Sequence, residues 1–544
     1  MGESDDGRDP RMSIPDPRLS EGHTRLRMGR PEEAEALADA LIRDNPDDTE
    51  ALYLKGMCRR AVYDYAGALE IFRDLDARTP GQAGVLIFLG LAHQGLGQSR
   101  EAEAAYAKAE KANPEQPLAA FYRGMALFDL GDKAGAVAAY QRCITLDPNH
   151  VAGLRSLAHT LHSMRRFEDA EAVAARGLKL AAGDPVLSAV KSDAELRRGE
   201  TQSARQRMEA VSLANASPVN AALALKTLGD VREAEGDHRG AWEAWSEANR
   251  RERDWALPAY GNDETPYSLA GVRRAKFFFD KAEGLTAGTA EGPSPVFLVG
   301  FPRSGTTLLE NILAAHPAIT TSEEKAHVWP ALAETGEYQA KLPDLMAADD
   351  ATLERLRTEY WKRACPNGLP GAGEVFIDKL PANLGWIGLI GRLFPGAKFL
   401  MAVRDPRDCV LSALQQRFAM GAAMFRMLDM EDAAAWYDAS FGAAEAARRA
   451  MPDLDVHVVR YEALVADLEG EARKAIAFLG LDWDDAVLDY RAKAKDRQIN
   501  TPSGPQVDKP VYSDSVGRWK NYAFAFEPAM PFLESWVEYW GYEH

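Results

Sequence analysis

The sequence predicts two kinds of fold along one chain: an N-terminal α-solenoid and, after it, an α/β domain built on a doubly wound parallel sheet. Small residues recur every 34 residues through the first half of the chain. An apolar run, a glycine turn and a helical pattern follow one another in residues 295–324. Beyond residue 294, short apolar runs alternate with helical patterns, which is typical of parallel strands covered by helices on both faces.

The first half of the chain is an internal repeat. An alanine recurs at the 34-residue interval, with a last step of 37, and a turn residue stands five positions before each alanine. A second small residue keeps the same register, so that two helices of each repeat can approach closely. The alanines are Ala34, Ala68, Ala102, Ala136, Ala170, Ala204 and Ala241; the turn residues are Gly29, Tyr63, Gly97, Gly131, Arg165, Gly199 and Gly236; the second series is Gly22, Gly56, Gly90, Gly124, Ala158, Ser192 and Gly229. With a proline after the second helix, this pattern resembles the tetratricopeptide repeat.

The repeat sets the expected domain boundaries. Residues 1–14 are expected to be a disordered tail, and residues 15–252 to form the solenoid of tetratricopeptide repeats. Residues 253–293 collect Pro, Gly, Thr and Asp around one amphipathic helix at 269–281, which is typical of a connecting region. Residues 294–544 are then predicted to form the second domain.

The composition limits the classes of partner. Hydrophobic residues make up 46% of the chain and charged residues 27%, as in ordinary globular proteins. The net charge of −18 disfavours nucleic acid and anionic membranes as partners. Neither a signal peptide nor a run of 18 apolar residues is present, so no membrane span is expected. The four cysteines form no C-x-x-C pair, which indicates neither a disulfide framework nor a zinc site, and we expect a cytoplasmic protein.

The turn after the first apolar run is typical of a P-loop-like anion site. Residues 296–299 suit a buried parallel strand, and a helix is predicted to start near Thr306. The first N–H groups of that helix lack intrahelical partners and are available to an anion. A Walker A loop would carry lysine at Thr306, and its absence disfavours a nucleotide kinase or ATPase. The expected donors are Arg303, Ser304, Gly305, Thr306 and Thr307.

A second anion site is predicted in the run FLMAVRDPRDCVLSALQQRF. Arg404 follows a predicted strand and Ser412 lies two helical turns later, so that a guanidinium and a hydroxyl can meet one phosphate. We expect this site to lie apart from the first. Asp405 and Arg407 are expected to be solvated charges on a surface helix.

Several motifs carry a resemblance to one enzyme family. GFPRSGTT resembles the 5′-phosphosulfate loop of sulfotransferases, and R-D-P-R-(x)4-S resembles their 3′-phosphate motif. TSEEKAHVWP, FIDKLPAN and TPSGPQVDKPVYSDSVGRWKNY are similar to segments of tyrosylprotein sulfotransferases and their bacterial relatives. The resemblance covers residues 294–544 and implies 3′-phosphoadenosine 5′-phosphosulfate as co-substrate, with 3′-phosphoadenosine 5′-phosphate as product and no metal ion.

The resemblance also implies roles for individual residues. Glu324 matches the catalytic base, Lys379 the catalytic lysine and Ser503 the transition-state serine. Tyr461 matches a tyrosine that contacts the cofactor, and Arg518 a basic residue at that site. Glu324 lies 17 residues beyond Thr307, so we expect the intervening helix and one turn to bring it back towards the loop.

Two positions leave alternatives open. Glu323 is the rival base. The relatives place a second arginine four residues after the serine, where this chain has Gln416 with Arg417 adjacent, and Arg417 is the candidate to replace it.

These motifs predict a metal-independent sulfotransferase. Sulfuryl transfer requires a base for the acceptor hydroxyl and donors for the moving group and the leaving phosphate. Repeats of this kind offer a concave surface that holds peptides, so we expect a protein or peptide acceptor, with tyrosine implied by the resemblance. Saccharide, lipid and small phenol acceptors remain open. So do a homodimer and a scaffold whose second domain only holds nucleotide.

Overall fold

The computed structural model describes residues 16–289, 292–334, 341–491 and 515–543. The chain divides into two compact units, Met1–Ser212 and Leu213–His544. The expected tail 1–14 and Ser503 lie outside the described residues. The division comes earlier than the boundary predicted after residue 252, because the helices α13 (Pro218–Ala234) and α14 (His238–Tyr260) pack within the second unit. These two helices nevertheless continue the repeat pattern of the first unit.

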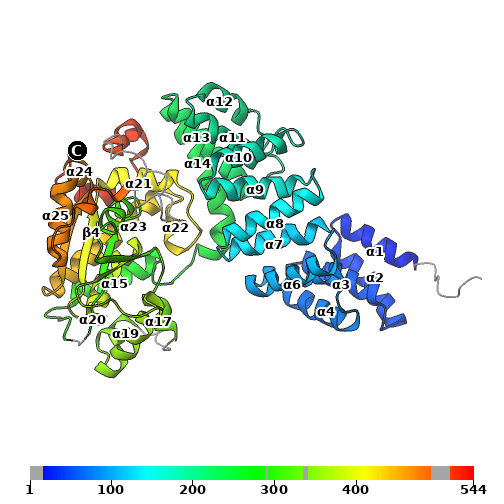
Figure 1. The fold of residues 1–544 in the computed structure, drawn as a ribbon, viewed down its shortest axis with the longest axis horizontal. Helices are drawn as coiled ribbons and strands as arrows, with labels where there is room; N and C mark the ends of the chain where they lie inside the picture. Colours follow the sequence, from blue (N-terminus) through cyan, green and yellow to red (C-terminus); the bar gives the residue numbers. More distant parts are fainter. Residues whose placement is uncertain (1–15, 290–291, 335–340, 492–514, 544) are drawn as a thin grey trace, which may run out of the picture. The chain divides into compact units, whose positions relative to one another are not determined.

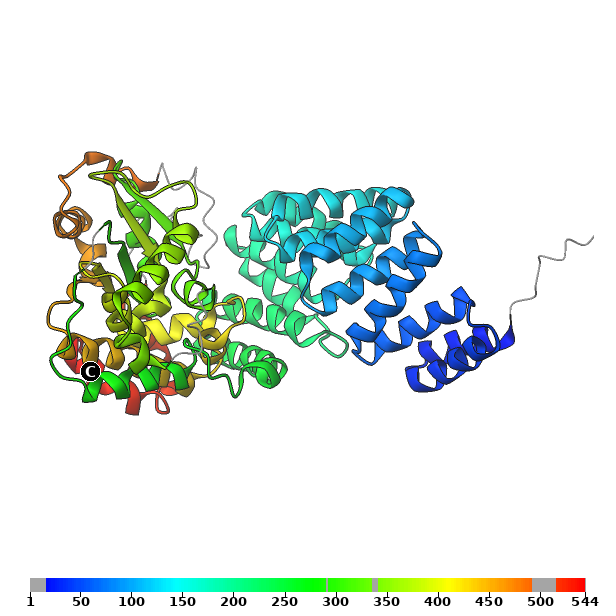
Figure 2. The same cartoon turned by 90° about the horizontal axis from the view of Figure 1, so that it is seen from below.

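The first unit is a stack of helix pairs (Figure 1), and Figure 2 shows the same stack from a second side. Its helices are α1 (Pro17–Arg27), α2 (Pro31–Asp44), α3 (Thr49–Ala61), α4 (Tyr65–Arg78), α5 (Ala83–Gly95), α6 (Ser99–Ala112), α7 (Pro117–Asp129), α8 (Lys133–Leu146), α9 (Val151–Ser163), α10 (Phe167–Leu178), α11 (Pro185–Arg197) and α12 (Thr201–Glu209).

The small residues at the repeat positions allow the close helix packing that their size predicts. All seven recurring alanines have 0% exposure. A Cβ atom added at Gly56 would lie 2.6 Å from the ring of Phe72, and one at Gly90 would lie 2.4 Å from the ring of Tyr106. The seven turn residues all have positive φ, and this includes Tyr63, where the backbone adopts the same turn without glycine. The predicted solenoid is therefore confirmed.

The second unit contains a five-stranded, fully parallel sheet with the order β2-β3-β1-β4-β5. Its strands are β1 (Val296–Gly300), β2 (Ile319–Glu323), β3 (Val375–Lys379), β4 (Lys398–Val403) and β5 (Asp455–Arg460). Strand β2 was not predicted from the sequence. Its residues ITTSE lie at the edge of the sheet, where only one neighbour and partial burial are needed, so they lack an apolar run.

Helices cover both faces of this sheet, as a doubly wound fold requires. The further helices of the second unit are α15 (Leu269–Lys281), α16 (Thr306–Leu313), α17 (Val328–Glu334), α18 (Leu342–Met346), α19 (Asp350–Ala364), η2 (Pro381–Trp386), α20 (Ile387–Leu393), α21 (Pro406–Gln415), α22 (Ala422–Arg426), α23 (Met430–Ala450), α24 (Tyr461–Ala466), α25 (Leu468–Leu479), η3 (Asp485–Val487), η5 (Arg518–Ala525) and α28 (Met530–Tyr539). Val296 and Leu298 pack with α16 and α25, whereas Phe297 and Val299 pack with α15, α20 and α23. No helix in the described ranges is long and apolar enough to cross a membrane.

Candidate functional site

The loop between β1 and α16 is shaped by two glycines. Gly305 has φ of 96°, and a Cβ atom there would lie 2.6 Å from the ring of Tyr461. A Cβ atom at Gly300 would lie 2.6 Å from Ser304 Oγ and 2.7 Å from the carbonyl oxygen of Ala402. Only glycine fits either position, so the loop backbone can lie against the ends of β4 and α24.

The predicted donors of this loop are buried around the start of α16. The helix begins at Thr306, as predicted, and Thr306 and Thr307 are 4% and 3% exposed. Ser304 Oγ is buried without a hydrogen-bond partner among the described residues. A buried hydroxyl without a hydrogen bond lowers the stability of the fold unless a ligand or a water molecule supplies that bond.

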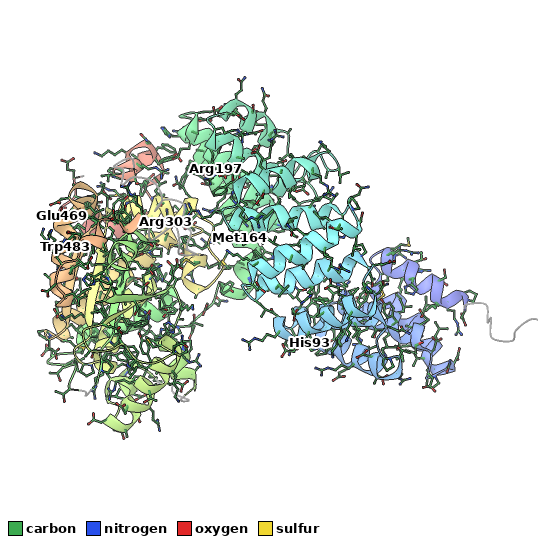
Figure 3. The ribbon with its side chains drawn as sticks, in the orientation of Figure 1. His93, Met164, Arg197, Arg303, Glu469 and Trp483 are labelled. Carbon is green, nitrogen blue, oxygen red and sulfur yellow. The ribbon has the colours of Figure 1, made fainter. Side chains whose placement is uncertain are left out.

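Arg303 joins the two predicted anion sites. Its Nε donates to Ser412 Oγ at 3.0 Å, and Arg404 Nη1 donates to the carbonyl oxygen of Arg303 at 3.1 Å (Figure 3 labels Arg303). The expectation that the second site lies apart from the first is therefore wrong. Strands β1 and β4 are neighbours in the sheet, so the loops that follow them meet at one edge.

Positive charge accumulates at this edge. Burial, together with the nearby cations of Arg404 and Arg518, lowers the pKa of Arg303 to about 10. Arg404 is 5% exposed, and its Nε has no hydrogen-bond partner in the described part of the chain. The carboxylate of Asp408 lies 3.8 Å from Arg404 Nη2. A concentration of buried guanidinium groups favours binding of an anion with several oxygens.

The segment after residue 514 closes over this cluster. Arg404 Nη2 donates to the carbonyl oxygen of Ser515, and Tyr461 lies 4.9 Å from the Arg404 guanidinium and 3.2 Å from Ser515 Oγ. Asp408 accepts from the backbone N–H groups of Gly517 at 2.6 Å and Trp519 at 2.9 Å. Sequence reasoning missed both Ser515 and Asp408, because Arg404 and Ser515 are 111 residues apart, and Asp408 is 109 and 111 residues from Gly517 and Trp519.

The expectation for Asp405 and Arg407 is also wrong. They are 6% and 2% exposed and pair at 2.8 Å, and Asp405 caps the N-terminus of α21. The ring of Trp519 lies 3.7 Å from the Arg407 guanidinium. The C-terminal segment covers this helix start, so the two charges are buried rather than solvated.

A second cluster lies where β2 and β3 end. Lys379 Nζ donates to Glu324 Oε1 at 2.9 Å and lies 3.2 Å from Glu310 Oε2. The Lys379 and Glu310 side chains are 0% and 2% exposed, whereas that of Glu324 is 36% exposed. The hydroxyl of Thr321 donates to the other oxygen of Glu310 at 2.8 Å. The structure thus brings Glu324 and Lys379 together, through strand β2 rather than one turn, and adds a carboxylate that the sequence did not reveal.

The backbone is strained at both clusters. Four described residues other than glycine have positive φ: Tyr63 and Arg165 at repeat turns, Arg303 at 73° and Glu324 at 45°. Residues held in this region mark sites where the surroundings impose the conformation. The N–H of Glu324 donates to the carbonyl oxygen of Lys379 at 2.8 Å, which fixes the Glu324 backbone beside β3.

Asp378 is a buried acid next to Lys379. It has 0% exposure, and burial raises the pKa of its carboxyl to about 7. The hydroxyl of Tyr360 donates to one carboxyl oxygen at 2.9 Å and opposes part of this shift. Asp378 therefore supports the end of β3 from the side of α19.

Helices α13 and α14 contact the cation cluster within the second unit. Glu233 pairs with Arg518 and accepts from Tyr522 Oη at 2.9 Å. Lys226 is buried and donates to the carbonyl oxygens of Leu414, at 2.8 Å, and Gln416. Burial lowers the pKa of Lys226 to about 7. These contacts fix the C-terminal end of α21, whose last turns carry Ser412.

Arg417 is half-buried near α14. Burial lowers its pKa, and the carboxylate of Glu252 opposes that shift. Glu252 on α14 and Lys226 on α13 are charged neighbours of Arg417. Its replacement of the arginine expected at Gln416 stays a prediction.

Family models match both parts of the chain. Residues 295–485 match the model described as the sulfotransferase family, and residues 19–83, 89–151 and 127–193 match tetratricopeptide repeat models. The sulfotransferase match contains both clusters described above, except for Arg518 and the segment around it.

The curated relatives include an uncharacterised protein and protein-tyrosine sulfotransferases. The chain is 27% identical over 398 residues to an uncharacterised protein of Aquifex aeolicus (strain VF5), covering 71% of this chain and 51% of the relative. It is 28% identical over 240 residues to protein-tyrosine sulfotransferase 1 of Danio rerio, covering 41% and 65%. It is 27% identical over 266 residues to protein-tyrosine sulfotransferase of Drosophila melanogaster, covering 46% and 51%. The chain thus spans about half to two thirds of the length of these relatives.

Proposed function

Because residues 295–485 match the model of the sulfotransferase family, we propose that the protein transfers a sulfuryl group from 3′-phosphoadenosine 5′-phosphosulfate to an acceptor hydroxyl. The observation that carries this proposal is the pair of clusters at one edge of the sheet. A buried arginine group follows β1 and β4, and a carboxylate–lysine group follows β2 and β3.

The donor set fits a nucleotide with phosphates at two positions. Ser304 Oγ and Arg404 Nε are buried polar atoms without partners among the described residues, and both lie in the arginine group. The start of α16, with Gly305, Thr306 and Thr307, would hold the 5′ phosphosulfate end. Arg303, which contacts Ser412, stands between that end and the 3′-phosphate that Arg404 and Ser412 would hold.

Glu324 and Lys379 can perform the transfer chemistry. Glu324 is the more exposed of the two, so its carboxylate can reach an acceptor hydroxyl and take its proton. As the proton moves, the acceptor oxygen forms a bond to sulfur, the bond from sulfur to the phosphate oxygen breaks, and the electron pair leaves with the bisphosphate. Lys379 supplies positive charge beside the moving group.

We propose a polypeptide acceptor, with tyrosine favoured. The named relatives are protein-tyrosine sulfotransferases, and helical repeats are commonly used to hold peptides. Binding energy from segments away from the reacting hydroxyl can orient that hydroxyl towards the base.

Nucleotide binding tests the first half of the proposal. We expect 3′-phosphoadenosine 5′-phosphate to raise the melting temperature and AMP to do so much less, because AMP lacks the 3′-phosphate. Arg404→Ala should weaken the bisphosphate about tenfold or more, since a charge-assisted contact contributes roughly 1.5–3 kcal/mol. Arg357→Ala, which removes a half-buried arginine bonded to the carbonyl oxygen of Leu393, is the matched control. Equal stabilisation by AMP would contradict a 3′-phosphate site.

Transfer of labelled sulfate tests the second half. We expect the wild type to label a tyrosine-containing protein or peptide, and Glu324→Gln to lose about 10²–10⁴-fold in rate while the bisphosphate still binds. Full activity of Glu324→Gln would exclude Glu324 as the base. Absence of transfer to proteins, saccharides, lipids and phenols alike, with binding intact, would instead indicate a domain that only holds nucleotide.

A further inference from the structure

The turn that carries Glu324 is fastened on both of its sides. Ser322 and His327 are buried, at 9% and 5% exposure, whereas residues 324–326 between them are exposed. A hydrogen bond of 2.7 Å joins Ser322 Oγ to His327 Nε2 across this turn. Two buried anchors thus hold a short exposed stretch of chain, and Glu324 lies at its start.

The backbone of Glu324 is fixed where the chain leaves β2. Its φ of 45° lies in the left-handed region, which a residue with a side chain adopts where the surroundings impose it. The N–H group of Glu324 donates to the carbonyl oxygen of Lys379 at 2.8 Å, and its carboxylate accepts from Lys379 Nζ at 2.9 Å. These contacts determine where Glu324 leaves the strand, and the bond from Ser322 to His327 determines where the chain goes next.

His327 is itself held by the residues that back β3. Its ring packs edge-on against the ring of Tyr360, with the centroids 5.9 Å apart, and Tyr360 Oη donates to Asp378 at 2.9 Å. Asp378 is the register partner of Ser322 and precedes Lys379 on β3. Because successive side chains of a strand point to opposite faces, Asp378 and Lys379 face opposite sides of the sheet. A buried polar group therefore supports, from behind, the strand end that carries Lys379.

The His327 ring is neutral, which suits a positioning role. Burial, with the nearby cations of Lys325 and Arg363, lowers the pKa of His327 to about 4. At neutral pH the ring therefore brings no positive charge to the Glu324 carboxylate, and its burial keeps it away from an acceptor. What the ring contributes to the turn is its packing and its hydrogen bond to Ser322.

We propose that His327 and Ser322 are positioning residues whose hydrogen bond holds the Glu324 carboxylate in the place from which it takes the acceptor proton. This inference rests on the proposed transfer function. The arginine group that would hold the nucleotide follows β1 and β4, whereas this turn follows β2, at the edge of the sheet. Loss of the hydrogen bond should therefore slow transfer and leave nucleotide binding in place.

Substitutions on both sides of the hydrogen bond test this role. His327→Leu and Ser322→Ala each remove the bond, so we expect kcat to fall about ten- to a hundredfold, as a slight misplacement of a reacting group would cause. The Kd of 3′-phosphoadenosine 5′-phosphate should change by less than about threefold. The double variant should be no slower than the slower single variant, because both substitutions remove the same bond. His327→Gln, whose amide can reach Ser322 in place of the ring Nε2, should restore most of the rate.

His316 provides the matched control. It is 7% exposed and precedes β2, at the end of the strand away from His327, and its Nε2 lies 3.0 Å from the carbonyl oxygen of Asp482. His316→Leu also removes a buried hydrogen bond, so it should lower the melting temperature about as much as His327→Leu does. It should leave kcat unchanged, which separates positioning from a general loss of stability.

Hydrogen exchange at the amide of Glu324 reports on the turn without any turnover. We expect exchange at this amide to be about tenfold or more faster in His327→Leu than in the wild type, because the backbone opens more readily when the turn is no longer closed. In His316→Leu the same amide should exchange at nearly the wild-type rate.

The outcomes separate this inference from the function on which it rests. A wild type that transfers no sulfuryl group would contradict the proposed function, and the exchange measurement would then decide whether the bond holds the turn. A wild type that transfers, with kcat unchanged in His327→Leu and Ser322→Ala, would overturn the positioning role. So would a His327→Gln variant as slow as His327→Leu, or equally fast exchange in His316→Leu and His327→Leu. If His327→Leu does not fold, Ser322→Ala decides in its place.

Discussion

At the scale of single residues, the two proposed clusters share an unusual backbone. Arg303 and Glu324 adopt left-handed conformations that cost a side-chain-bearing residue about 1–2 kcal/mol. Glycine would remove this cost at both positions. The chain instead keeps an arginine and a glutamate there, which is expected where the side chain has a task that outweighs folding stability.

We predict that the free energy of unfolding of Glu324→Gly is about 1 kcal/mol greater than that of Glu324→Ala, because only glycine adopts a φ of 45° without strain. This order is the reverse of the order in a helix. Denaturant unfolding of the two variants measures this difference. Tyr63→Gly and Tyr63→Ala provide the control, since Tyr63 has a φ of 63° and is 78% exposed in the repeats. The free energy of unfolding should again be greater for the glycine variant than for the alanine variant, and both variants should leave sulfuryl transfer unchanged. Glu324→Ala proving the more stable variant would show that this backbone is not strained.

Asp378 predicts a pH dependence of stability. Folding raises the pKa of its carboxyl from 3.8 to about 7. Between these pH values the folded chain therefore keeps a proton on Asp378 that the unfolded chain has lost. The wild type therefore loses stability from this group as pH rises from about 4 to about 7. Asp378→Asn does not titrate and still accepts from Tyr360. The melting temperature of this variant minus that of the wild type should therefore rise by about 5 °C between pH 5 and pH 8. Asp455→Asn, at an exposed strand start, is the control, and a gap that stays constant with pH would contradict the prediction.

At the scale of elements, α13 and α14 belong to the repeat by sequence and to the second unit by packing. A Cβ atom added at Gly229 would lie 2.3 Å from the ring of Trp245, as close as at the corresponding glycines of the earlier repeats. Glu233, Lys226 and Asn249 then contact Arg518 and the end of α21. This helix pair therefore supports the arginine group from outside the matched sulfotransferase region.

We predict that Glu233→Gln weakens 3′-phosphoadenosine 5′-phosphate about three- to tenfold, because Arg518 and Tyr522 lose the carboxylate that fixes them. Isothermal titration measures the affinity, and Glu243→Gln on the exposed face of α14 is the control. Unchanged affinity in Glu233→Gln would mean that Arg518 is positioned by other contacts.

At the scale of the whole molecule, sequence periodicity predicted most of the architecture. The 34-residue interval located the helix pairs, and the alternation of apolar runs with helical patterns beyond residue 294 predicted the parallel sheet. Strand β2 was missed because ITTSE is polar, although this strand delivers Glu324 beside Lys379. Glu310 was missed because no sequence motif singles out this residue of α16. The contacts of Glu233 with Arg518 and of Asp408 with Trp519 join segments 285 and 111 residues apart, which no local pattern reveals.

The division of the chain decides how the acceptor proposal should be tested. A fragment that begins at residue 253 would lack Lys226, Glu233 and Asn249, so the appropriate fragment contains residues 213–544. We predict that it keeps the kcat/KM of the full chain for a simple phenol and loses tenfold or more for a protein acceptor, because the repeats orient only the larger substrate. Equal rates on both acceptors would show that residues 16–212 do not hold the substrate.

The shared helix pair also constrains how the chain can diverge. In a solenoid each repeat contacts only its neighbours, so units can be duplicated or deleted along the array during evolution. That freedom applies to the helix pairs before α13, which pack as a stack within the first unit. The last pair carries Lys226, Glu233 and Asn249 on its packed side, so a duplication or deletion there would remove contacts from α21 and Arg518. We therefore expect homologues to vary in repeat number at the N-terminal end while the final pair changes slowly, which a comparison of repeat counts among related sequences can check.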